Sequence, residues 1–447
     1  MKILVLNGSP KGENSITLQT VRYLEKKFRL ESLEVLHVGM KIKSLEKNFA
    51  PALEALEKAD VLLFSYPVYT FIAPCQLHRF IELMKTHGAK VEGKIATQIS
   101  TSKHFYDITA HRYIQDNVQE MGMNYIRGLS ADMEDLTTEK GRQEAENWWK
   151  TFLWKAEKGF FEPSLLLKGQ TASVPVTVPE ENFEGKPGDV VIIADIAPED
   201  TQLAGMVSRF RSVLPYGTRV VNLREYPFKG GCLGCFRCAV SGKCVHKDNF
   251  DEFLRNEIQT ADAMVYAFAI RDHSMGALFK MYDDRQFCNG HRTVTIGMPV
   301  GYLISGNLTR EENLRTVIEG RANVGNNILA GIATDEEDTD AAIDRFAQSL
   351  AYSLEHKNVG PQNFLGVGGM KIFRDLIYQM RGFMRADHKF FKSHGQYDFP
   401  QKKWMQSLAM YLVGAMIANP KVHSKMGNKM NEGMLMPYKK VLEDMEK

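Results

Sequence analysis

The order of secondary-structure signals repeats along this chain, and the repeat limits the possible folds more than any single motif does. Short apolar runs, typical of buried strands, alternate with helical periodicity over residues 1–160, and the same order returns over residues 188–355. Such alternation implies crossover connections, and therefore a parallel sheet with helices on both faces. The sequence thus predicts an internal duplication into two α/β domains with doubly wound parallel sheets.

The individual elements follow from apolar runs and turn signals. The expected strands are KILVLN, LEVLHV, DVLLFSYPVY and KIATQIST in the first repeat, and GDVVIIADI, TRVVNL, DAMVYAFAI and TVTIGMPVGYLIS in the second. The expected helices cover residues 15–28, 50–58, the stretch around Trp148 and Trp149, 201–214 and 249–260. Residues 163–187 contain four prolines and show little periodicity, which indicates a linker. The predicted parts are domain one at 1–162, the linker at 163–187, domain two at 188–358 and a helical C-terminal extension at 359–447.

Composition places the chain among globular proteins. It has 447 residues, which is long for one core, with 44% hydrophobic and 25% charged residues. The net charge of +2 gives no reason to expect nucleic-acid binding. The apolar run after Met1 is too short for a signal peptide, and residues 408–418 are too short for a membrane span. We therefore expect a soluble, cytoplasmic protein without a membrane span.

The turn after the first strand, Asn7 to Ser15, has the character of an anion-binding loop. It opens the first helix, where unpaired N–H groups favour negative charge. It matches neither GxGxxG nor GxxxxGK[ST], which argues against a dinucleotide fingerprint or a P-loop. Hydroxyl, amide and ammonium donors for a phosphate are expected from Ser9, Lys11, Asn14, Ser15 and Thr17.

Two later strand ends converge on the same edge of the sheet, where ligands of open parallel sheets bind. One carries the aromatic segment Tyr66 to Phe71, and the other carries a polar run from Ser100. An aromatic loop for a flat ring beside a hydroxyl-rich phosphate loop indicates a flavin mononucleotide (FMN) site. The further residues expected to contact FMN are Pro67, Val68, Tyr69, Thr70, Thr101, Ser102 and His104.

Four of the six cysteines lie in one short run: Cys232, Cys235, Cys238 and Cys244. Thiolates spaced by two residues can turn inward from one loop, and the fourth can close a polynuclear iron-sulfur site. Zinc is the nearest alternative, although zinc sites usually combine two separate pairs of ligands. Reactive thiols, favoured by Arg237 and Lys243, and a merely structural loop also remain open.

These motifs together resemble the NADPH-dependent FMN reductase and iron-sulfur flavoprotein branch of the flavodoxin-like superfamily, in tandem duplication. The resemblance rests on LNGSPKGENS, on SYPVYTFIAPCQLHRFIEL and on the restart that ends in the cysteine run. It implies two flavodoxin-like domains, non-covalent FMN and a [4Fe-4S] cluster on the four cysteines. It also implies that subunits pair, so that flavin and cluster can exchange electrons.

The two repeats depart from the family pattern in complementary ways. The first has KIKSLEKNFA where the second has its cysteine loop. The first turn of the second repeat contains Asp195, Glu199 and Asp200 and no glycine, so it would repel a phosphate. The second repeat also has Ala269, Ile270 and Arg271 in place of the aromatic segment. We expect a single-chain pseudo-dimer with one FMN and one cluster.

Three further features have competing interpretations. If helical, His104, Asp107 and His111 share one face, as a metal site, a proton relay or polar groups bonded to nearby backbone. Cys75 and Cys288 are interpreted as buried or incidental thiols. Apolar residues at 373, 376, 377, 380, 383 and 384 predict a helix packed on the body with a solvated basic face, or a docking surface for an acidic redox partner.

The expected function is that of an FMN-dependent oxidoreductase. It would pass electrons between a reduced donor, NAD(P)H or ferredoxin, and an acceptor through FMN and the cluster. No acid-base or nucleophilic catalytic set is required, and none stands out. The alternatives are a non-catalytic redox carrier or sensor, and an FMN reductase whose cysteine loop binds zinc or carries free thiols.

Overall fold

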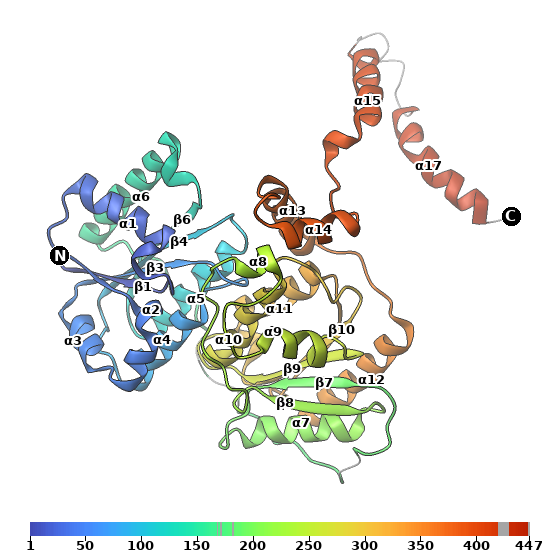
Figure 1. Ribbon diagram of the computed structural model, residues 1–447, viewed down its shortest axis with the longest axis horizontal. Coiled ribbons are helices and arrows are strands. Elements are labelled where there is room, and N and C mark those ends of the chain that lie inside the picture. Colours follow the sequence, from blue (N-terminus) through green and yellow to red (C-terminus); the bar gives the residue numbers. More distant parts are fainter. Residues whose placement is uncertain (168, 170–171, 181–182, 419–428, 446–447) are drawn as a thin grey trace. The chain divides into compact units, whose positions relative to one another are not determined.

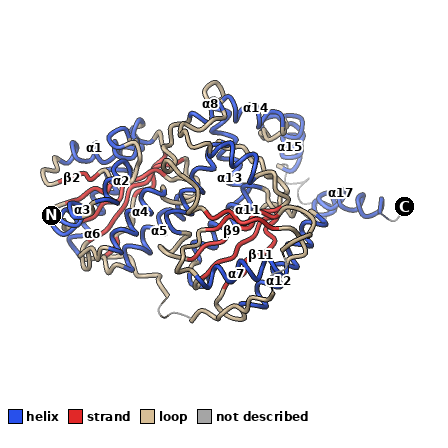
Figure 2. The backbone as a smooth tube through the Cα atoms, turned by 60° about the horizontal axis from the view of Figure 1, so that its bottom comes forward, coloured by secondary structure: helices blue, strands red, loops and turns tan. Residues whose placement is uncertain are grey.

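A computed structural model describes residues 1–167, 169, 172–180, 183–418 and 429–445. The chain forms two compact units, Met1–Phe390 and Phe391–Lys447. The first unit contains two parallel sheets, each covered by helices on both faces (Figures 1 and 2). This architecture confirms the predicted fold: two flavodoxin-like α/β domains in tandem, followed by a helical C-terminal part.

The first domain is built on strands β1 to β6. The strands are β1 Ile3–Asn7, β2 Leu33–Leu36, β3 Val61–Pro67, β4 Ile95–Ser102, β5 Asn124–Tyr125 and β6 Leu129–Asp132. The helices are α1 Ile16–Phe28, α2 Val38–Lys47, α3 Ala50–Lys58, α4 Cys75–Thr86, α5 Asp107–Glu120 and α6 Glu139–Lys158. The strand order is β2-β1-β3-β4-β5, and β6 pairs with the C-terminal half of β4.

The second domain repeats this order. Its strands are β7 Val190–Ala194, β8 Thr218–Asn222, β9 Ala263–Ala269, β10 Pro299–Ser305 and β11 Ile328–Thr334. Its helices are α7 Thr201–Val213, α8 Arg237–Ser241, α9 Phe250–Phe253, α10 Gly276–Arg285, α11 Glu312–Gly325 and α12 Thr339–His356. The order β8-β7-β9-β10-β11 corresponds strand for strand to that of the first domain, which supports the predicted duplication.

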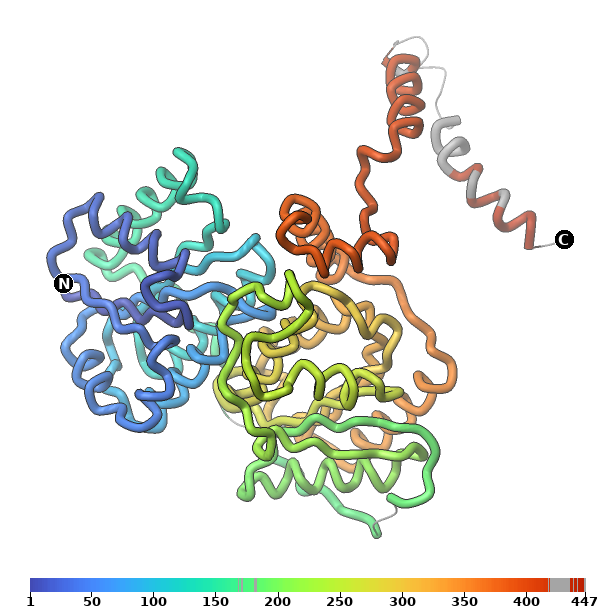
Figure 3. The backbone as a smooth tube through the Cα atoms, viewed as in Figure 1, coloured from blue at the N-terminus to red at the C-terminus, as the bar shows by residue number. Residues whose placement is uncertain are grey.

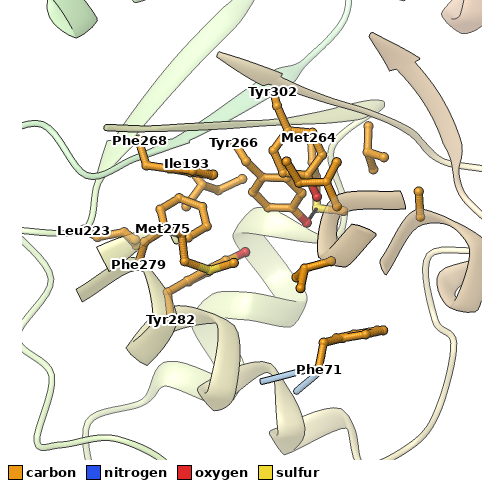
Figure 4. Packing of buried hydrophobic residues seen from close by; sticks show 14 of the residues in the cluster. Phe71, Ile193, Leu223, Met264, Tyr266, Phe268, Met275, Phe279, Tyr282 and Tyr302 are labelled. Carbon is orange, nitrogen blue, oxygen red and sulfur yellow. Dashed lines mark hydrogen bonds between the residues drawn. The ribbon is translucent and has the colours of Figure 1, made fainter. Parts of the chain in front are cut away.

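Alternation along the strands assigns helices to the faces of each sheet. In β1, Val5 faces α1 and α6, whereas Leu4 and Leu6 face the side of α2 to α5. In β7, Ile192 likewise faces α7 and α12, and Val191 faces the side of α9 to α11. The buried core of the second domain also takes in Phe71, Ile72 and Tyr106 of the first, so one hydrophobic cluster joins the domains (Figure 4).

Equivalent helices meet between the domains. Helix α4 packs on α10 and α5 packs on α11, and each pair occupies the same position in the two repeats. The buried carboxylate of Asp272 accepts hydrogen bonds across this interface from His78 Nδ1 at 2.6 Å and from Tyr113 Oη at 2.8 Å. Asn117 donates to the Asp272 carbonyl at 2.9 Å. The domains are therefore paired as two subunits of a two-fold dimer would be.

Several expected boundaries shift. The helix expected over 249–260 is a short α9 followed by a π-helix, Leu254–Ile258, and the strand expected from Thr293 begins at Pro299. The C-terminal part has helices α13 Phe364–Gln379, α14 Arg385–Ser393, α15 Trp404–Ile417 and α17 Lys429–Met445. The helix expected to run through Met384 ends at Gln379. No helix within the described residues is long and apolar enough to cross a bilayer.

Candidate functional site

The turn after β1 is held by its own side chains. Asn7 Nδ2 donates to the Gly12 carbonyl at 2.9 Å, and Asn7 Oδ1 accepts from Ser9 N at 3.2 Å. Gly12 has φ +56°, a conformation that suits glycine, and a Cβ there would meet the Met40 side chain. Ser15 caps α1 by accepting a hydrogen bond from Leu18 N at 3.4 Å. The loop thus presents Ser9, Lys11 and Ser15 on one side.

The segment after β3 is strained and is secured by the second domain. Thr70 and Phe71 have φ values of +42° and +74°, which non-glycine residues adopt only when the surroundings impose them. Tyr69 and Ile72 exchange two backbone hydrogen bonds of 2.8 and 3.2 Å. The buried ammonium of Lys280, on α10, donates to the Tyr69 carbonyl at 2.9 Å and pairs with Asp284. One domain therefore fixes the aromatic loop of the other.

These loops and the cysteine run line one cavity of about 1350 Å³, open solvent at its mouth included. The first domain contributes ten of the residues predicted to contact FMN: Ser9, Lys11, Ser15, Thr17, Pro67, Val68, Tyr69, Thr70, Thr101 and Ser102. The second domain contributes all four predicted metal ligands: Cys232, Cys235, Cys238 and Cys244. The structure thus brings the two predicted sites together in one chamber.

Two predicted residues are not brought there. Asn14 is exposed at the end of a short 3-10 turn and does not line the cavity. His104 lies before α5 with φ +56°, where its Nδ1 pairs with Asp107 Oδ2 at 2.9 Å, and it is also absent from the lining. The condition under which His104, Asp107 and His111 would share a helix face is not met, because the helix begins only at Asp107.

His111 and Asp107 are instead engaged locally. Ser100 Oγ lies 2.8 Å from His111 Nε2, and Ser130 Oγ donates to Asp107 at 2.6 Å. Burial lowers the pKa of His111 to about 4. The partners of these groups are side chains, and not the neighbouring backbone that was expected.

The cysteine loop folds closely against the first domain. Gly234 has φ +58°, and a Cβ there would overlap the hydroxyl of Tyr69. A Cβ at Gly231 would overlap the sulfur of Cys75. Gln76 Nε2 donates to the Cys232 carbonyl at 3.1 Å. Because glycine allows this approach, the loop lies on the aromatic segment of the first domain.

Arg285 anchors the loop from within. Its buried guanidinium donates to both carboxylate oxygens of Asp248, at 2.7 and 2.8 Å, and to the Gly230 carbonyl at 2.8 Å. His246 Nε2 lies 2.9 Å from the Gly231 carbonyl, so that nitrogen is occupied by the backbone. Sequence reasoning missed Arg285, although its position after two aspartates was the available signal.

The four thiols differ in exposure: Cys235 is exposed, whereas Cys232, Cys238 and Cys244 are partly buried. Burial raises the pKa of Cys232, and it raises that of Cys238 to about 11. Arg237 and Lys243, which were expected to favour thiolates, are exposed and do not line the cavity. Cys288 and Cys75 are buried as expected, but Cys288 also lines the cavity.

The chamber fits FMN by its unpaired donors. Thr70 and Ser102 line the cavity, and their buried hydroxyls have no hydrogen-bond partner among the described residues. Thr17 and Thr101 hydroxyls pair at 2.5 Å beside them. Burial lowers the pKa of Lys11, against the opposing effect of Cys235 and Cys232, and its ammonium lies 5.6 Å from the Phe236 ring centre. Buried donors without partners suit a ligand rich in acceptors.

The four thiols match the number of ligands of a four-iron centre. Among the described residues, no three His, Cys, Asp or Glu side chains lie close enough to hold a single metal ion. A four-iron cluster does not require such convergence, because each cysteine binds a different iron. The shared cavity supplies the four thiols that such a cluster uses.

The equivalent turn of the second domain holds two carboxylates, and both are paired with arginines. Asp195 is buried and pairs with Arg224 at 2.7 Å, and Asp200 pairs with Arg271 at 2.8 Å. The arginines neutralise the carboxylates and tie the turn to the ends of β8 and β9. The second domain therefore contributes cysteines to the chamber but no second anion loop.

A second cavity of about 900 Å³ adjoins the first. Both are lined by Thr70, Phe105, Phe287, Gly290, His291 and Phe373. Beyond these, Tyr266, Tyr302 and the buried ion pair of Arg321 with Asp283 line its wall; Figure 4 shows the two tyrosines side by side. Helix α13 reaches this junction through Phe373, whose ring stacks on Phe105 with centres 4.5 Å apart.

The family model of NADPH-dependent FMN reductases matches residues 1–134. That stretch is therefore similar to an NADPH-dependent FMN reductase domain. The FMN reductase domain thus contains β1 to β6 with both ligand loops, and the second repeat, with its cysteines, lies outside the match. No curated protein matches the sequence.

Solved structures similar to the chain each cover about a third of it. An NADPH-quinone reductase from P. pentosaceus is 16% identical over 34% of this chain and 97% of its own, with a TM-score of 0.28. The general stress protein 14 of Treponema denticola, in complex with FMN, is 15% identical over 35% and 99%, with a TM-score of 0.28. An FMN-dependent NADH-azoreductase from Bacillus anthracis, also with FMN, is 14% identical over 34% and 99%, with a TM-score of 0.27.

Proposed function

We propose that the protein is an FMN-dependent oxidoreductase that passes electrons between NAD(P)H or ferredoxin and an acceptor through FMN and a [4Fe-4S] cluster. The observation that supports this most is the single cavity lined by both ligand loops of the FMN reductase domain and by all four cysteines. Bound FMN would supply the exchange between two-electron and one-electron chemistry.

The chain's own residues divide the binding work. Lys11, Ser9 and Ser15, at the start of α1, would hold the phosphate, where the helix dipole also favours an anion. Tyr69 and Thr70 would position the flavin ring, and Lys280 would keep their strained turn in place. Cys232, Cys235, Cys238 and Cys244 would bind the irons. The second cavity, with its aromatic lining, offers room for a flat acceptor beside the flavin.

The deciding experiment is anaerobic purification followed by assays of FMN, iron, sulfide and zinc per chain. We expect about one FMN and about four irons with matching sulfide. Zinc without iron would establish the alternative of an FMN reductase with a zinc loop. Bound cofactors without turnover of NADH, NADPH or reduced ferredoxin would favour a redox carrier or sensor.

Two variants separate the cofactors. Lys11→Gln should weaken FMN binding about tenfold and leave riboflavin binding unchanged, because only FMN carries the phosphate. Cys238→Ser should lose iron and keep FMN, whereas the matched control Cys75→Ser should keep both. Equal loss of FMN and riboflavin in Lys11→Gln, or full iron in Cys238→Ser, would contradict the assignment.

A further inference from the structure

Helix α15 carries no charged side chain, and apolar side chains occupy all of its faces. Its sequence, WMQSLAMYLVGAMI, has only Gln406 and Ser407 as amide or aliphatic hydroxyl side chains. Met410 and Leu412 lie two residues apart, on opposite faces of the helix, and are 58% and 62% exposed. Trp404 and Tyr411 are exposed as well. A helix that is apolar all round is normally covered on all sides.

The sequence around α15 is basic. Between residues 400 and 431 there are five lysines and no aspartate or glutamate. Lys402 and Lys403 immediately precede the helix, and both are exposed. The whole chain has a net charge of only +2, so this positive charge is a local feature. It favours a negatively charged partner.

The last described helix, α17, is suited to the same kind of surface. Leu435, Tyr438, Leu442 and Met445 recur at spacings of three and four and are all exposed, so they form one apolar face. Lys439, four residues after Leu435, lies at the edge of this face. Amphipathic helices of this kind lie in the boundary between lipid headgroups and acyl chains.

A lipid layer accounts for these features better than a protein does. A protein groove covers one face of a helix, and a second copy of this chain would bring an identical basic segment with it. A lipid layer takes up apolar side chains without a matching groove, and anionic headgroups pair with the lysines. With 14 residues α15 is about 21 Å long, less than the roughly 30 Å of a bilayer core, so it would lie in the interface rather than cross.

We propose that α15, with Lys402 and Lys403, docks the protein on the surface of a membrane that contains anionic lipids. Trp404 and Tyr411 are the side-chain types that settle at the headgroup level, and the lysines face the lipid charge. This function is independent of the flavin and of the thiols. It would place a soluble redox domain beside acceptors that partition into lipid.

The test is cosedimentation of the full-length protein with vesicles. Vesicles of phosphatidylcholine mixed with phosphatidylglycerol should bind it, less so as salt is raised, and pure phosphatidylcholine should bind it far more weakly. Leu412→Asp should reduce binding about tenfold or more, because the variant loses the favourable free energy of burying a leucine side chain. Lys402→Glu combined with Lys403→Glu should reduce binding to the anionic vesicles by a similar factor.

The matched control is Tyr352→Asp, an exposed aromatic on α12, which should bind like the unmodified protein. Failure to bind anionic vesicles at low salt would overturn the proposal. Undiminished binding of Leu412→Asp would also overturn it. So would a homodimer that Leu412→Asp dissociates while vesicles stay unbound, because a second copy would then cover the helix.

Discussion

Gly234 shows how closely the two halves of the chamber are fitted. Its φ of +58° is unfavourable for side chains, and the space where a Cβ would lie is filled by the hydroxyl of Tyr69. Gly234 lies between Cys232 and Cys235, and the turn of the loop alone would be enough to explain a glycine there. Here it also allows the loop to lie against a flavin-loop tyrosine from the other domain, so one residue serves both proposed sites.

Gly234→Ala should therefore disturb the chamber. We expect it to lower the free energy of unfolding by about 2–4 kcal/mol, from backbone strain and from displacement of Tyr69. Gly242→Ala is the control, since Gly242 has φ +74° but open space around the Cβ position. It should cost only about 1 kcal/mol. Urea unfolding of both variants checks this, and equal losses would show that Tyr69 does not matter.

The side chains that the sequence placed correctly are those whose position follows from a strand end. Ser9 and Tyr69 follow strands of the first sheet, Thr101 is the second-last residue of β4, and parallel strands end at a common edge. Asn14 and His104 do not line the cavity, because the local backbone sets the direction of their side chains. Asn14 lies in a 3-10 turn, and His104 has a left-handed φ. Such conformations leave no periodic signal in a sequence.

Helix α1 links local stability to the proposed phosphate site through its first residue. Ser15 caps the helix and also lines the cavity. Thr138 caps α6 in the same way, accepting from Gly141 N at 3.0 Å, but lies away from the cavity. The two caps therefore allow the structural and the binding roles of a cap to be measured separately.

Ser15→Ala and Thr138→Ala should each lower the free energy of unfolding by about 1 kcal/mol. Only Ser15→Ala should also weaken FMN binding relative to riboflavin, because Ser15 lines the cavity and is proposed to hold the phosphate. Urea unfolding and flavin fluorescence titration provide the two measurements. Weakened FMN binding in both variants would mean that the effect comes from general loosening of the domain.

Elements with regular periodicity were predicted well, and those that depend on tertiary contacts were not. The first four strands of each repeat follow from apolar runs such as DVLLFS, and β1 and β7 differ from expectation by one or two residues at an end. The sequence analysis missed β5, β6 and β11. Helix α2 and the cysteine loop occupy the same place in the two repeats, after β2 and β8, yet share no pattern. The predicted helix through Met384 was too long. The helix ends before Met380, although the apolar spacing of the sequence continues beyond it.

The pairing of the two domains depends on buried charge as well as on apolar packing. His273, which precedes α10, lies between Glu120 of the first domain, at 3.4 Å, and Glu311 of the second, at 2.9 Å. Burial alone would lower the pKa of His273, but the two carboxylates raise it to about 9. The protonated histidine thus holds the two domains together.

This raised pKa predicts a pH dependence of stability. The unfolded histidine titrates near 6.5, so its stabilising effect is complete below about pH 6.5 and is lost as the pH rises through about 9. The loss should reach at most about 3 kcal/mol. His273→Gln should show a smaller decline between these pH values, whereas His356→Gln, at the exposed end of α12, should decline like the unmodified protein. Urea unfolding across this pH range is the measurement.

The pairing of equivalent helices within one chain has an evolutionary consequence. In a homodimer every substitution appears twice, so a change that improves one ligand loop alters its symmetric copy as well. Here α4 meets α10 and α5 meets α11 inside a single polypeptide (Figure 3). The two copies could therefore diverge independently, one gaining cysteines and the other keeping its glycine turn. Covalent linkage also fixes the ratio of the two halves at one to one, whatever the concentration of the protein.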